Sequence, residues 1–477
     1  AIQQANDAGI ACTITLTQSI YLSEAYNNTN FAFPEITGQI RISGAAHRIN
    51  RVENENSYGF FNVASGAELT LEWVTLAGAN TPAISSSNAT VTIRNSMFFG
   101  NHGGNGPVDT FSSTVNTVGS TFDGNSGNGS GGIHAVAGTV TITDSVFYGG
   151  VGTAAPPNAA SAVFSAGATT TITNTILHNS VNTDVPQCAG DTPPTAESSN
   201  IASDASCGDA VVLGDSTAAQ DLNGLSCDQV TFPAYVGTTE SLATAINCAN
   251  ANPDPNVIVV TQDLTVTQVN SENPTIGLPG IYTPITIAGL NADNKTQLSR
   301  NSDDPANFGL FYVRAPGRLT LYRMQLSNGL APYGGAVHVD GDLGSGATLT
   351  SVDSDFDNNQ AENRAGAVYV DGSSGGAFTR FIDGSFSGNS ASASAGAVMN
   401  NGINGYWAIM YLTQVEFNNN IAPEGSALVS NGSTGRATVV SYFSSFSGDS
   451  PQCFNVDPRW PFEMGSYNFS DGTCQSD

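Results

Sequence analysis

Three aspartates alternate along one short stretch and have the spacing best suited to acid–base or metal chemistry. Asp353, Asp355 and Asp357 would share one face of a strand, because successive strand residues point to opposite sides. A glycoside hydrolase needs paired carboxylates, whereas a calcium-dependent polysaccharide lyase needs clustered carboxylates and a basic side chain. Phe356 points the opposite way, which predicts that the aspartate face is outward, and we interpret that face as simply solvated.

The other side chains capable of chemistry are scattered. Asp303 and Asp304 precede a proline and predict a turn rather than a metal site. The run Gly103-Gly104-Asn105-Gly106 begins like a calcium-binding nonapeptide but is not repeated. No histidine shares a phase with a serine or cysteine nucleophile; the five are His47, His102, His134, His178 and His338. We therefore predict no catalytic residue, no cofactor, and no metal beyond weak surface binding of Ca²⁺.

An enzyme acting on polysaccharides remains the alternative, and it makes a prediction about position. Its groove would bring acids, an arginine and exposed aromatic rings together on one wall of the protein. The residues to inspect for such a wall are Tyr322, Arg323, Arg364 and Tyr369.

The spacing of the seven cysteines predicts disulfides at equivalent places in two halves of the chain. Loops of about 20 residues would each be closed by a bond contributing roughly 3 kcal/mol. The predicted pairs are Cys188–Cys207, Cys453–Cys474 and Cys227–Cys248. Cys12 is left over, either as a buried free thiol or with a partner outside this chain. No Cys-x-x-Cys pair indicates a metal site.

The elements that position these residues are indicated by a recurring phrase, an aromatic residue followed three positions later by Asn. It occurs at Phe98/Asn101, Phe122/Asn125, Phe356/Asn359, Phe386/Asn389 and Phe417/Asn420. A second phrase of two small residues, Ala and an aliphatic residue begins at Gly334, Ala365, Ala395 and Gly425. A period near 30 residues indicates stacked structural repeats.

Between the phrases lie short alternating runs such as Thr90-Val91-Thr92-Ile93, which predict strands. Stacking each coil about 4.8 Å above the last would bury the aliphatic face, so we predict an all-β fold of the β-solenoid type. The repeated Phe would stack along the axis. The repeated Asn would occupy a left-handed bend and hydrogen-bond to its copies. An ordinary β-sandwich is the alternative, but its strands do not repeat one side chain at one phase.

A larger repeat divides the chain into two modules. Residues 59–71 match residues 309–321 at an offset of 309 − 59 = 250. We predict module one at 1–212, a linker at 213–226 and module two at 227–477. The best helical candidate is 241–250. The first residues of module one match a motif of module two, and in module two a leading segment precedes that motif. We interpret the chain as a processed or polymerised unit of a longer array, or alternatively as part of a larger polypeptide.

Composition excludes several classes of partner. The formal net charge is −27, because there are 13 basic and 40 acidic residues and Lys295 is the single lysine. Such a chain repels nucleic acids and anionic membranes. No run of 18 apolar residues predicts membrane insertion. Few charges and much Ser, Thr, Asn and Gly favour a secreted β-rich protein, extracellular or on the cell surface.

The Gly-Gly-Ala-Val phrase at 334–337 and the Phe-x-x-Asn phrases resemble the repeats of polymorphic outer-membrane protein adhesins. The resemblance is clear over 334–449 and thinner over 89–180. The cysteine-containing module ends are similar to those of large bacterial secreted β-helix proteins. Both resemblances imply a right-handed parallel β-helix outside the cell with a binding or structural role, and they supply no catalytic residues.

We therefore expect an extracellular structural or adhesive protein. Its expected partners are copies of itself or a host or matrix surface. Head-to-tail assembly into a filament is expected because solenoid ends are open sheet edges, and residues 1–6 are where a second copy would add.

Overall fold

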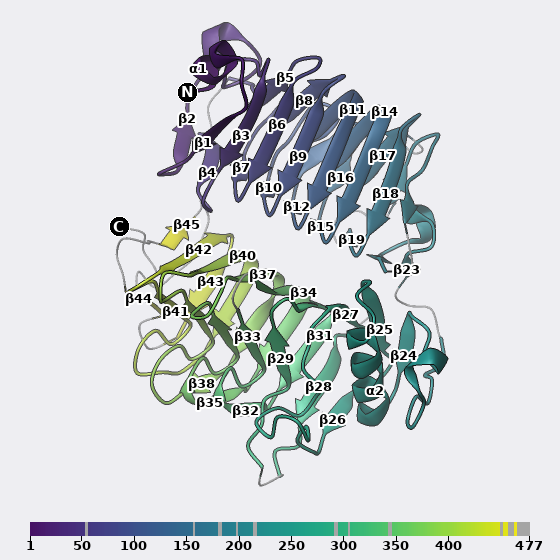
Figure 1. Cartoon of the computed structure of the whole chain (residues 1–477), viewed down its shortest axis with the longest axis vertical. Helices are drawn as coiled ribbons and strands as arrows, with labels where there is room; N and C mark the ends of the chain where they lie inside the picture. Colours follow the sequence, from purple (N-terminus) through teal and green to yellow (C-terminus); the bar gives the residue numbers. More distant parts are fainter. Residues whose placement is uncertain are drawn as a thin grey trace. The chain divides into compact units, whose positions relative to one another are not determined.

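The alternating Thr/Val/Ile runs form parallel strands that stack coil on coil in a computed structural model of the chain (Figure 1). Every strand pair among the described residues is parallel, which confirms the predicted β-solenoid. The chain divides into unit 1, Ala1–Val212, and unit 2, Leu213–Asp477. The structure describes residues 1–52, 56–155, 158–179, 184–196, 199–212, 217–290, 294–303, 306–341, 346–448, 452–456 and the backbone of 462–464.

Unit 1 has two large sheets and a small one, and each coil contributes a strand or two to them. The strands of the first sheet are β1 (Cys12–Thr15), β3 (Gln39–Ser43), β5 (Phe61–Val63), β6 (Glu68–Glu72), β8 (Ile84–Ser87), β9 (Thr90–Arg94), β11 (Val108–Val118), β14 (Ile133–Thr143), β17 (Val163–Ala166), β18 (Thr169–Thr173), β20 (Cys188–Ala189) and β21 (Thr195–Ala196). The strands of the second are β2 (Ile20–Leu22), β4 (Arg48–Arg51), β7 (Thr75–Ala77), β10 (Met97–Phe99), β12 (Thr121–Asp123), β15 (Val146–Tyr148), β19 (Ile176–His178), β22 (Ile201–Ala202) and β23 (Val211–Val212). The small sheet pairs β13 (Ser126–Gly127) with β16 (Val151–Gly152).

Unit 2 has three sheets. The strands of the largest are β24 (Ala234–Val236), β25 (Asn256–Val260), β26 (Leu264–Val266), β27 (Pro284–Gly289), β28 (Thr296–Arg300), β30 (Arg318–Tyr322), β31 (Met324–Ser327), β34 (Ala347–Asp357), β37 (Ala377–Ser387), β40 (Trp407–Asn418), β42 (Arg436–Tyr442), β43 (Ser445–Ser447) and β45 (Phe462–Met464). The second comprises β29 (Phe311–Arg314), β33 (Val337–Asp340), β36 (Val368–Asp371), β39 (Val398–Asn401), β41 (Leu428–Asn431) and β44 (Cys453–Asn455). The third comprises β32 (Leu330–Tyr333), β35 (Gln360–Arg364) and β38 (Ser390–Ala391).

A helix near the start of each unit packs on its core. The predicted helix at 241–250 is α2 (Thr239–Asn250), and it buries Leu242 and Ile246 in the core of unit 2. In unit 1, residues 1–6 fall largely within α1 (Ile2–Ala8), which buries Ile2 and Ala5. Among the described residues there are also three short 3₁₀ turns: Tyr26–Asn28, Ala205–Cys207 and Cys227–Gln229.

The repeated phenylalanines stack inside the coils, as predicted. In unit 1, Phe122 lies between Phe98, at 4.7 Å between ring centroids, and Phe147, at 4.5 Å. In unit 2, Phe386 lies between Phe356, at 4.6 Å, and Phe417, at 5.0 Å. The four pairs are within 10° of parallel, because the strand registers place one ring directly above the next.

The repeated asparagines also stack, but the predicted left-handed conformation was wrong. The residue with positive φ is the one before the Asn: Gly100, Gly124, Asn358, Gly388 and Asn419. The Asn itself points inward and is buried, as at Asn101, Asn125, Asn359, Asn389 and Asn420. Amide-to-amide hydrogen bonds of 2.9–3.1 Å run along the axis and confirm the predicted ladder. The sequence could not show that the bend lies one residue before the Asn, because Gly and Asn both tolerate positive φ.

The small-residue phrase marks a close approach between coils. A Cβ atom on Gly366 would lie 2.1 Å from the carbonyl oxygen of Gly396, and one on Gly396 would lie 2.1 Å from that of Ser426. The Ala that follows each glycine is buried in the core, as Ala367 and Ala397 show. Glycine is therefore required at Gly366 and Gly396, whereas the last copy of the phrase has Ser426 in the same place, so the phrase has a structural explanation.

Candidate functional site

The three alternating aspartates lie on the outer side of β34, as predicted, with Phe356 fully buried behind them. They do not form one straight face, however, because Asp353 has a φ of 47° and occupies a left-handed bend within the long strand. Asp355 and Asp357 follow that bend on one outward side. This bend recurs in neighbouring coils at Arg323 and Asp383, which brings further charged residues near the aspartates.

The single lysine of the chain binds two of these aspartates. Lys295 Nζ lies 2.8 Å from Asp355 Oδ1 and 3.3 Å from Asp353 Oδ1. Ser385 donates a hydrogen bond of 2.8 Å to the same Asp355 oxygen, and Arg323 Nε lies 3.5 Å from Asp353 Oδ2. Burial lowers the pKa of Lys295, but the hydrogen bond and charge of Asp355, followed by Asp353, outweigh it and raise the pKa above its ordinary value. Burial raises the pKa of Asp353, and Lys295 offsets part of that rise.

Asp357 lines an open hollow of about 430 Å³ on unit 2. The other residues of this hollow are polar and include Gln297, Gln325, Ser327, Ser387 and Asn419. Gln325 donates a 2.6 Å hydrogen bond to Asp357 Oδ2, and Gln297 donates one of 2.9 Å to Ser327 Oγ. Burial raises the pKa of Asp357, although the hydrogen bond from Gln325 works against the rise. The hollow therefore offers amides, hydroxyls and one carboxylate.

The four residues chosen to reveal an enzyme groove do not meet on one wall. Tyr322 is buried at the end of β30, and Arg323 next to it pairs with Asp353. Arg364 ends β35 in the third sheet, and Tyr369 lies in β36 of the second sheet. Tyr369 packs on Tyr333, with ring centroids 5.1 Å apart. Tyr322, Arg364 and Tyr369 thus belong to three different sheets of unit 2.

An aromatic cluster around His338 was missed by sequence reasoning. Its ring centroid lies 5.3 Å from that of Tyr312 and 5.2 Å from that of Tyr369. The register aligns these three residues in successive coils, each just after an inward-facing residue of the second sheet. The sequence signal that could have predicted this cluster is that His338 and Tyr369 each directly follow the Val of a small-residue phrase. Burial lowers the pKa of His338, although the charges of Asp340 and Asp371 oppose that shift.

A histidine–aspartate pair lies in unit 1. His134 Nδ1 is 2.8 Å from Asp109 Oδ1, and Asn105 donates a 3.0 Å hydrogen bond to the other Asp109 oxygen. His134 also stacks on Phe164 at 4.9 Å. Within the described ranges, no group of three His, Cys, Asp or Glu side chains is arranged to hold a metal ion.

Two of the predicted disulfides are present. Cys188–Cys207 joins β20 to the 3₁₀ turn near the end of unit 1, and Cys227–Cys248 ties the leading segment of unit 2 to α2. In the third predicted pair, Cys453 is buried in β44, whereas Cys474 lies outside the described residues. Cys12 is a free thiol at the start of β1 and is half-buried rather than fully buried. Disulfides are typical of oxidising environments.

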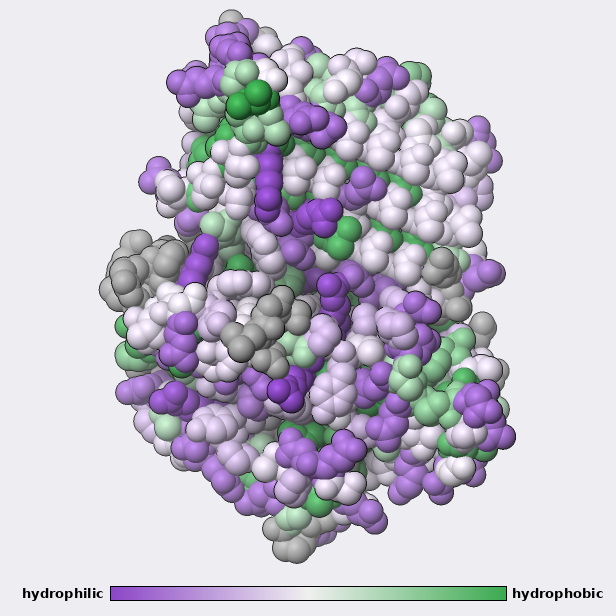
Figure 2. Space-filling model, viewed as in Figure 1, coloured by the Kyte–Doolittle hydropathy of each residue, from purple (hydrophilic) through white to green (hydrophobic). Residues whose placement is uncertain are grey.

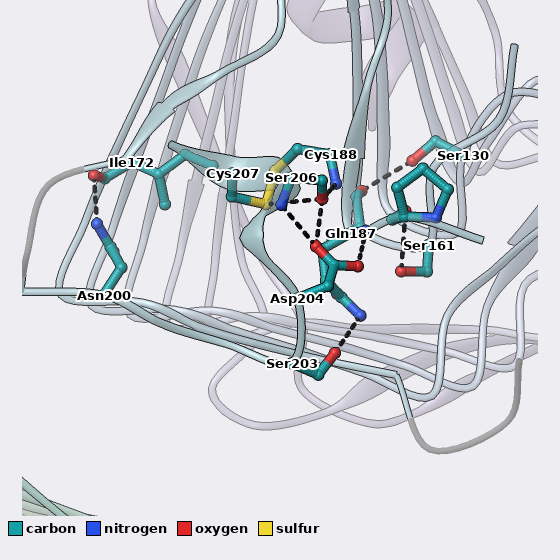
Figure 3. The surroundings of a disulfide bond; sticks show 12 residues. Ser130, Ser161, Ile172, Gln187, Cys188, Asn200, Ser203, Asp204, Ser206 and Cys207 are labelled. Carbon is teal, nitrogen blue, oxygen red and sulfur yellow. Dashed lines mark hydrogen bonds between the residues drawn. A yellow bond between two sulfur atoms is a disulfide. The ribbon is translucent and has the colours of Figure 1, made fainter. Parts of the chain in front are cut away.

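Figure 3 shows how polar side chains surround the first disulfide. Asp204 accepts hydrogen bonds of 2.9 Å from the backbone N–H groups of Gln187 and Ser206. Ser206 Oγ accepts a 3.0 Å hydrogen bond from the Cys188 backbone N–H. Gln187 Nε2 donates to Ser203 Oγ at 2.8 Å. These bonds fix the last coils of unit 1, so this constellation is a structural staple.

Removing that staple should destabilise unit 1. The double variant Cys188→Ser/Cys207→Ser is expected to lose about 3 kcal/mol of unfolding free energy, because a 19-residue separation is no longer closed in the unfolded chain. Urea denaturation followed by fluorescence measures the loss. Cys12→Ser is the control for loss of a thiol without loss of a disulfide, and at this half-buried site it should change stability by less than about 1 kcal/mol. Equal effects from both variants would show that the disulfide contributes nothing.

The lysine–aspartate cluster predicts a pH-dependent contribution to stability. Lys295→Met should cost about 1–3 kcal/mol near neutral pH, because it leaves the partly buried Asp355 without its cation and Asp353 with Arg323 alone. The raised pKa of Lys295 means that the wild-type contribution is present below the ordinary lysine pKa and is lost as the pH rises through the folded value. The difference between wild type and variant should therefore disappear in strong alkali.

A double-mutant cycle with Asp355→Asn separates the pair from other effects of either change. Urea denaturation of the two single variants and the double variant should give a coupling energy of at least about 0.5 kcal/mol. Strict additivity of the two losses would contradict the assigned ion pair.

No protein-family model matches the sequence, and a search of curated proteins finds no similar chain. Among the helices that the structure describes, none has the length and apolar character needed to cross a membrane. The fold therefore defines the class of protein, a parallel β-helix repeat protein with disulfides.

Proposed function

We propose that this chain is an extracellular structural or adhesive β-helix protein. The observation that carries the proposal is the stacking of the recurring residues. The repeated Phe and Asn are buried in ladders, and the repeated Gly fills the contact between coils. The recurring residues of this chain are therefore explained by packing and hydrogen bonding within the scaffold. The disulfides agree with a place outside the reducing cytoplasm.

The charged residues support the same proposal. Lys295 neutralises Asp353 and Asp355, and Arg323 adds a second cation beside Asp353. The residues expected of an enzyme groove lie on separate sheets instead of facing a common substrate. A repeat scaffold whose aspartate cluster is neutralised in this way fits a protein that binds or builds a surface.

A polysaccharide-active enzyme is the second candidate, and the hollow beside Asp357 is the observation that favours it. An aspartate with a raised pKa, next to Asp355, resembles the acid and base of a glycoside hydrolase. The chain should be incubated with a panel of neutral and acidic polysaccharides, and new reducing or unsaturated ends should be measured. No release is expected. Release that Asp357→Asn abolishes would replace the structural proposal with the enzymatic one.

Head-to-tail association into a filament is the proposed assembly. Strands β1 and β2 are the first strands of the two large sheets of unit 1, and among the described residues each pairs with a neighbour on one side only, which is the kind of edge that an added copy would extend. Light scattering against concentration, with electron microscopy of the same samples, is expected to show growing linear particles. A chain that stays monomeric at high concentration would contradict the filament but leave an adhesive role intact.

A further inference from the structure

One outward surface of unit 1 is a regular array of threonines. It is formed by β9, the later halves of β11 and β14, and β18, which pair without any shift of register. Three columns of four outward residues run across these strands. The columns are Thr90/Thr114/Thr139/Thr169, Thr92/Asn116/Thr141/Thr171 and Arg94/Val118/Thr143/Thr173. We call this surface the threonine face.

The face is rigid and repeats in two directions. Neighbouring strands lie about 4.8 Å apart, and residues two apart on one strand are separated by roughly 6.8 Å. Threonine is β-branched and therefore stiff at χ1, which holds each methyl and hydroxyl in place. Among the described residues, none of the nine threonine hydroxyls hydrogen-bonds to another protein group. The hydroxyls are thus available to an external partner as both donors and acceptors.

This composition is not a necessary result of the fold. The corresponding columns of the largest sheet in unit 2 mix three threonines, Thr320, Thr348 and Thr350, with bulky or charged residues: Arg318, Phe378, Arg380, Ile409 and Tyr411. Figure 2 shows the region over β9, β11, β14 and β18 as a broad pale area of near-neutral hydropathy. In a chain with a net charge of −27, the threonine face carries one charge, at Arg94 on its edge.

Charge, area and side-chain type restrict the partner. Its one charge, at Arg94 on the edge, gives the face little complementarity to a nucleic acid, an anionic lipid or an acidic polymer, which need several cations. Its twelve positions cover only on the order of 400 Å², about half of what each partner contributes to a standard protein interface, which argues against a stable dimer. None of the twelve residues is aromatic, so no ring is available to stack on the sugars of a polysaccharide.

We propose that the threonine face binds the surface of ice. An ice surface is a flat, uncharged, rigid array of hydrogen-bonding groups that repeats on the same few-ångström scale as the face. The hydroxyls would join that array, and the methyl groups between them would order the intervening water. The proposal concerns unit 1 alone and does not depend on the proposed structural or adhesive function.

The test measures capture of the fluorescently labelled full-length chain in slowly growing ice, together with the gap between its freezing and melting temperatures. Wild type is expected to enter the ice and to widen the gap. Thr141→Lys/Thr171→Lys places two charged, longer side chains in the middle of the face and should abolish both effects. Thr265→Lys changes an exposed strand threonine of β26 in unit 2 and should leave both unchanged. Melting temperatures of all three proteins in solution show that each is folded.

Three results would overturn the proposal. The first is exclusion of the wild-type chain from ice. The second is capture that persists unchanged in Thr141→Lys/Thr171→Lys. The third is retention on crystalline chitin or cellulose, or dimerisation in sedimentation, that the double variant abolishes while ice capture is absent. The last result would reassign the threonine face to a polysaccharide or to a second copy of the chain.

Discussion

Phe122→Ala is expected to remove about 3–5 kcal/mol from the free energy of unfolding of unit 1. Phe122 is 1% exposed and stacks on Phe98 and Phe147, in the coils before and after its own. Truncation would leave a cavity between two rings that are fixed by paired strands and cannot close the gap. Because each coil contacts only its neighbours, the loss should also weaken the coupling in stability between the coils before Phe122 and the coils after it. Urea denaturation, with hydrogen exchange in each coil, measures both effects.

Phe111→Ala is the matched control for that prediction. Phe111 lies in β11, the strand of the preceding sheet in the same coil, but it is 55% exposed. It has the same chemistry and a similar place in the sequence, so only burial distinguishes the two sites. Phe111→Ala should cost less than about 1 kcal/mol. A comparable loss at both positions would show that the ring stack does not hold the coils together.

Asn389→Asp is expected to destabilise unit 2 by at least about 3 kcal/mol at neutral pH, because it places a charge in a buried amide ladder. The Asn389 amide donates to the Phe356 carbonyl oxygen at 2.8 Å and to Asn420 Oδ1 at 2.9 Å. Its oxygen accepts from the backbone N–H of Asn359 at 2.9 Å. A carboxylate retains the acceptor role but would face two oxygens without a donor.

The loss should depend on pH with a definite sign. Burial and the two facing oxygens would raise the folded-state pKa of the introduced carboxyl above its unfolded value of about 3.9. The penalty is therefore full above the folded pKa and shrinks as the pH falls toward the unfolded value, where the group is neutral in both states. Unfolding free energies from urea titrations between neutral and acid pH would follow this change.

Asn419→Asp gives the control for the same change of charge. Asn419 is exposed, has a φ of 54°, and lies directly before the ladder residue Asn420 in the next coil. Aspartate tolerates this left-handed conformation, so a change of less than about 0.5 kcal/mol is expected. A pH-independent loss in Asn389→Asp, or an equal loss in the control, would contradict the buried ladder.

The core of this fold was predictable because the same buried residues recur from coil to coil. Phe386 and Asn389 recur at one phase, and parallel strands allow only one arrangement that buries the same residue in every coil. The bends were less predictable, since Gly388 and Asn389 both tolerate left-handed φ and only the burial of the amide shows which residue bends.

The candidate site was harder to predict because its partners come from distant coils. Lys295 pairs with Asp355 across 60 residues, and no repeated phrase links the two. The outward direction of the aspartates followed from alternation, whereas the bend at Asp353 and the pairing with Lys295 required the structure. The hollow beside Asp357 likewise collects residues from several coils, in or beside β28, β31, β34 and β37.

The asparagine ladder also determines how such a chain can change in length. Ladder partners Asn359 and Asn389 are 30 residues apart, and Asn389 and Asn420 are 31 apart. Each coil receives and offers the same hydrogen bonds, so a whole coil can be duplicated or deleted without exposing an unmatched amide or shifting a ring. A shorter insertion inside a strand would displace every inward residue of that coil. Growth or loss of the scaffold by complete coils is therefore the tolerated path, and length variation within a coil is confined to its loops.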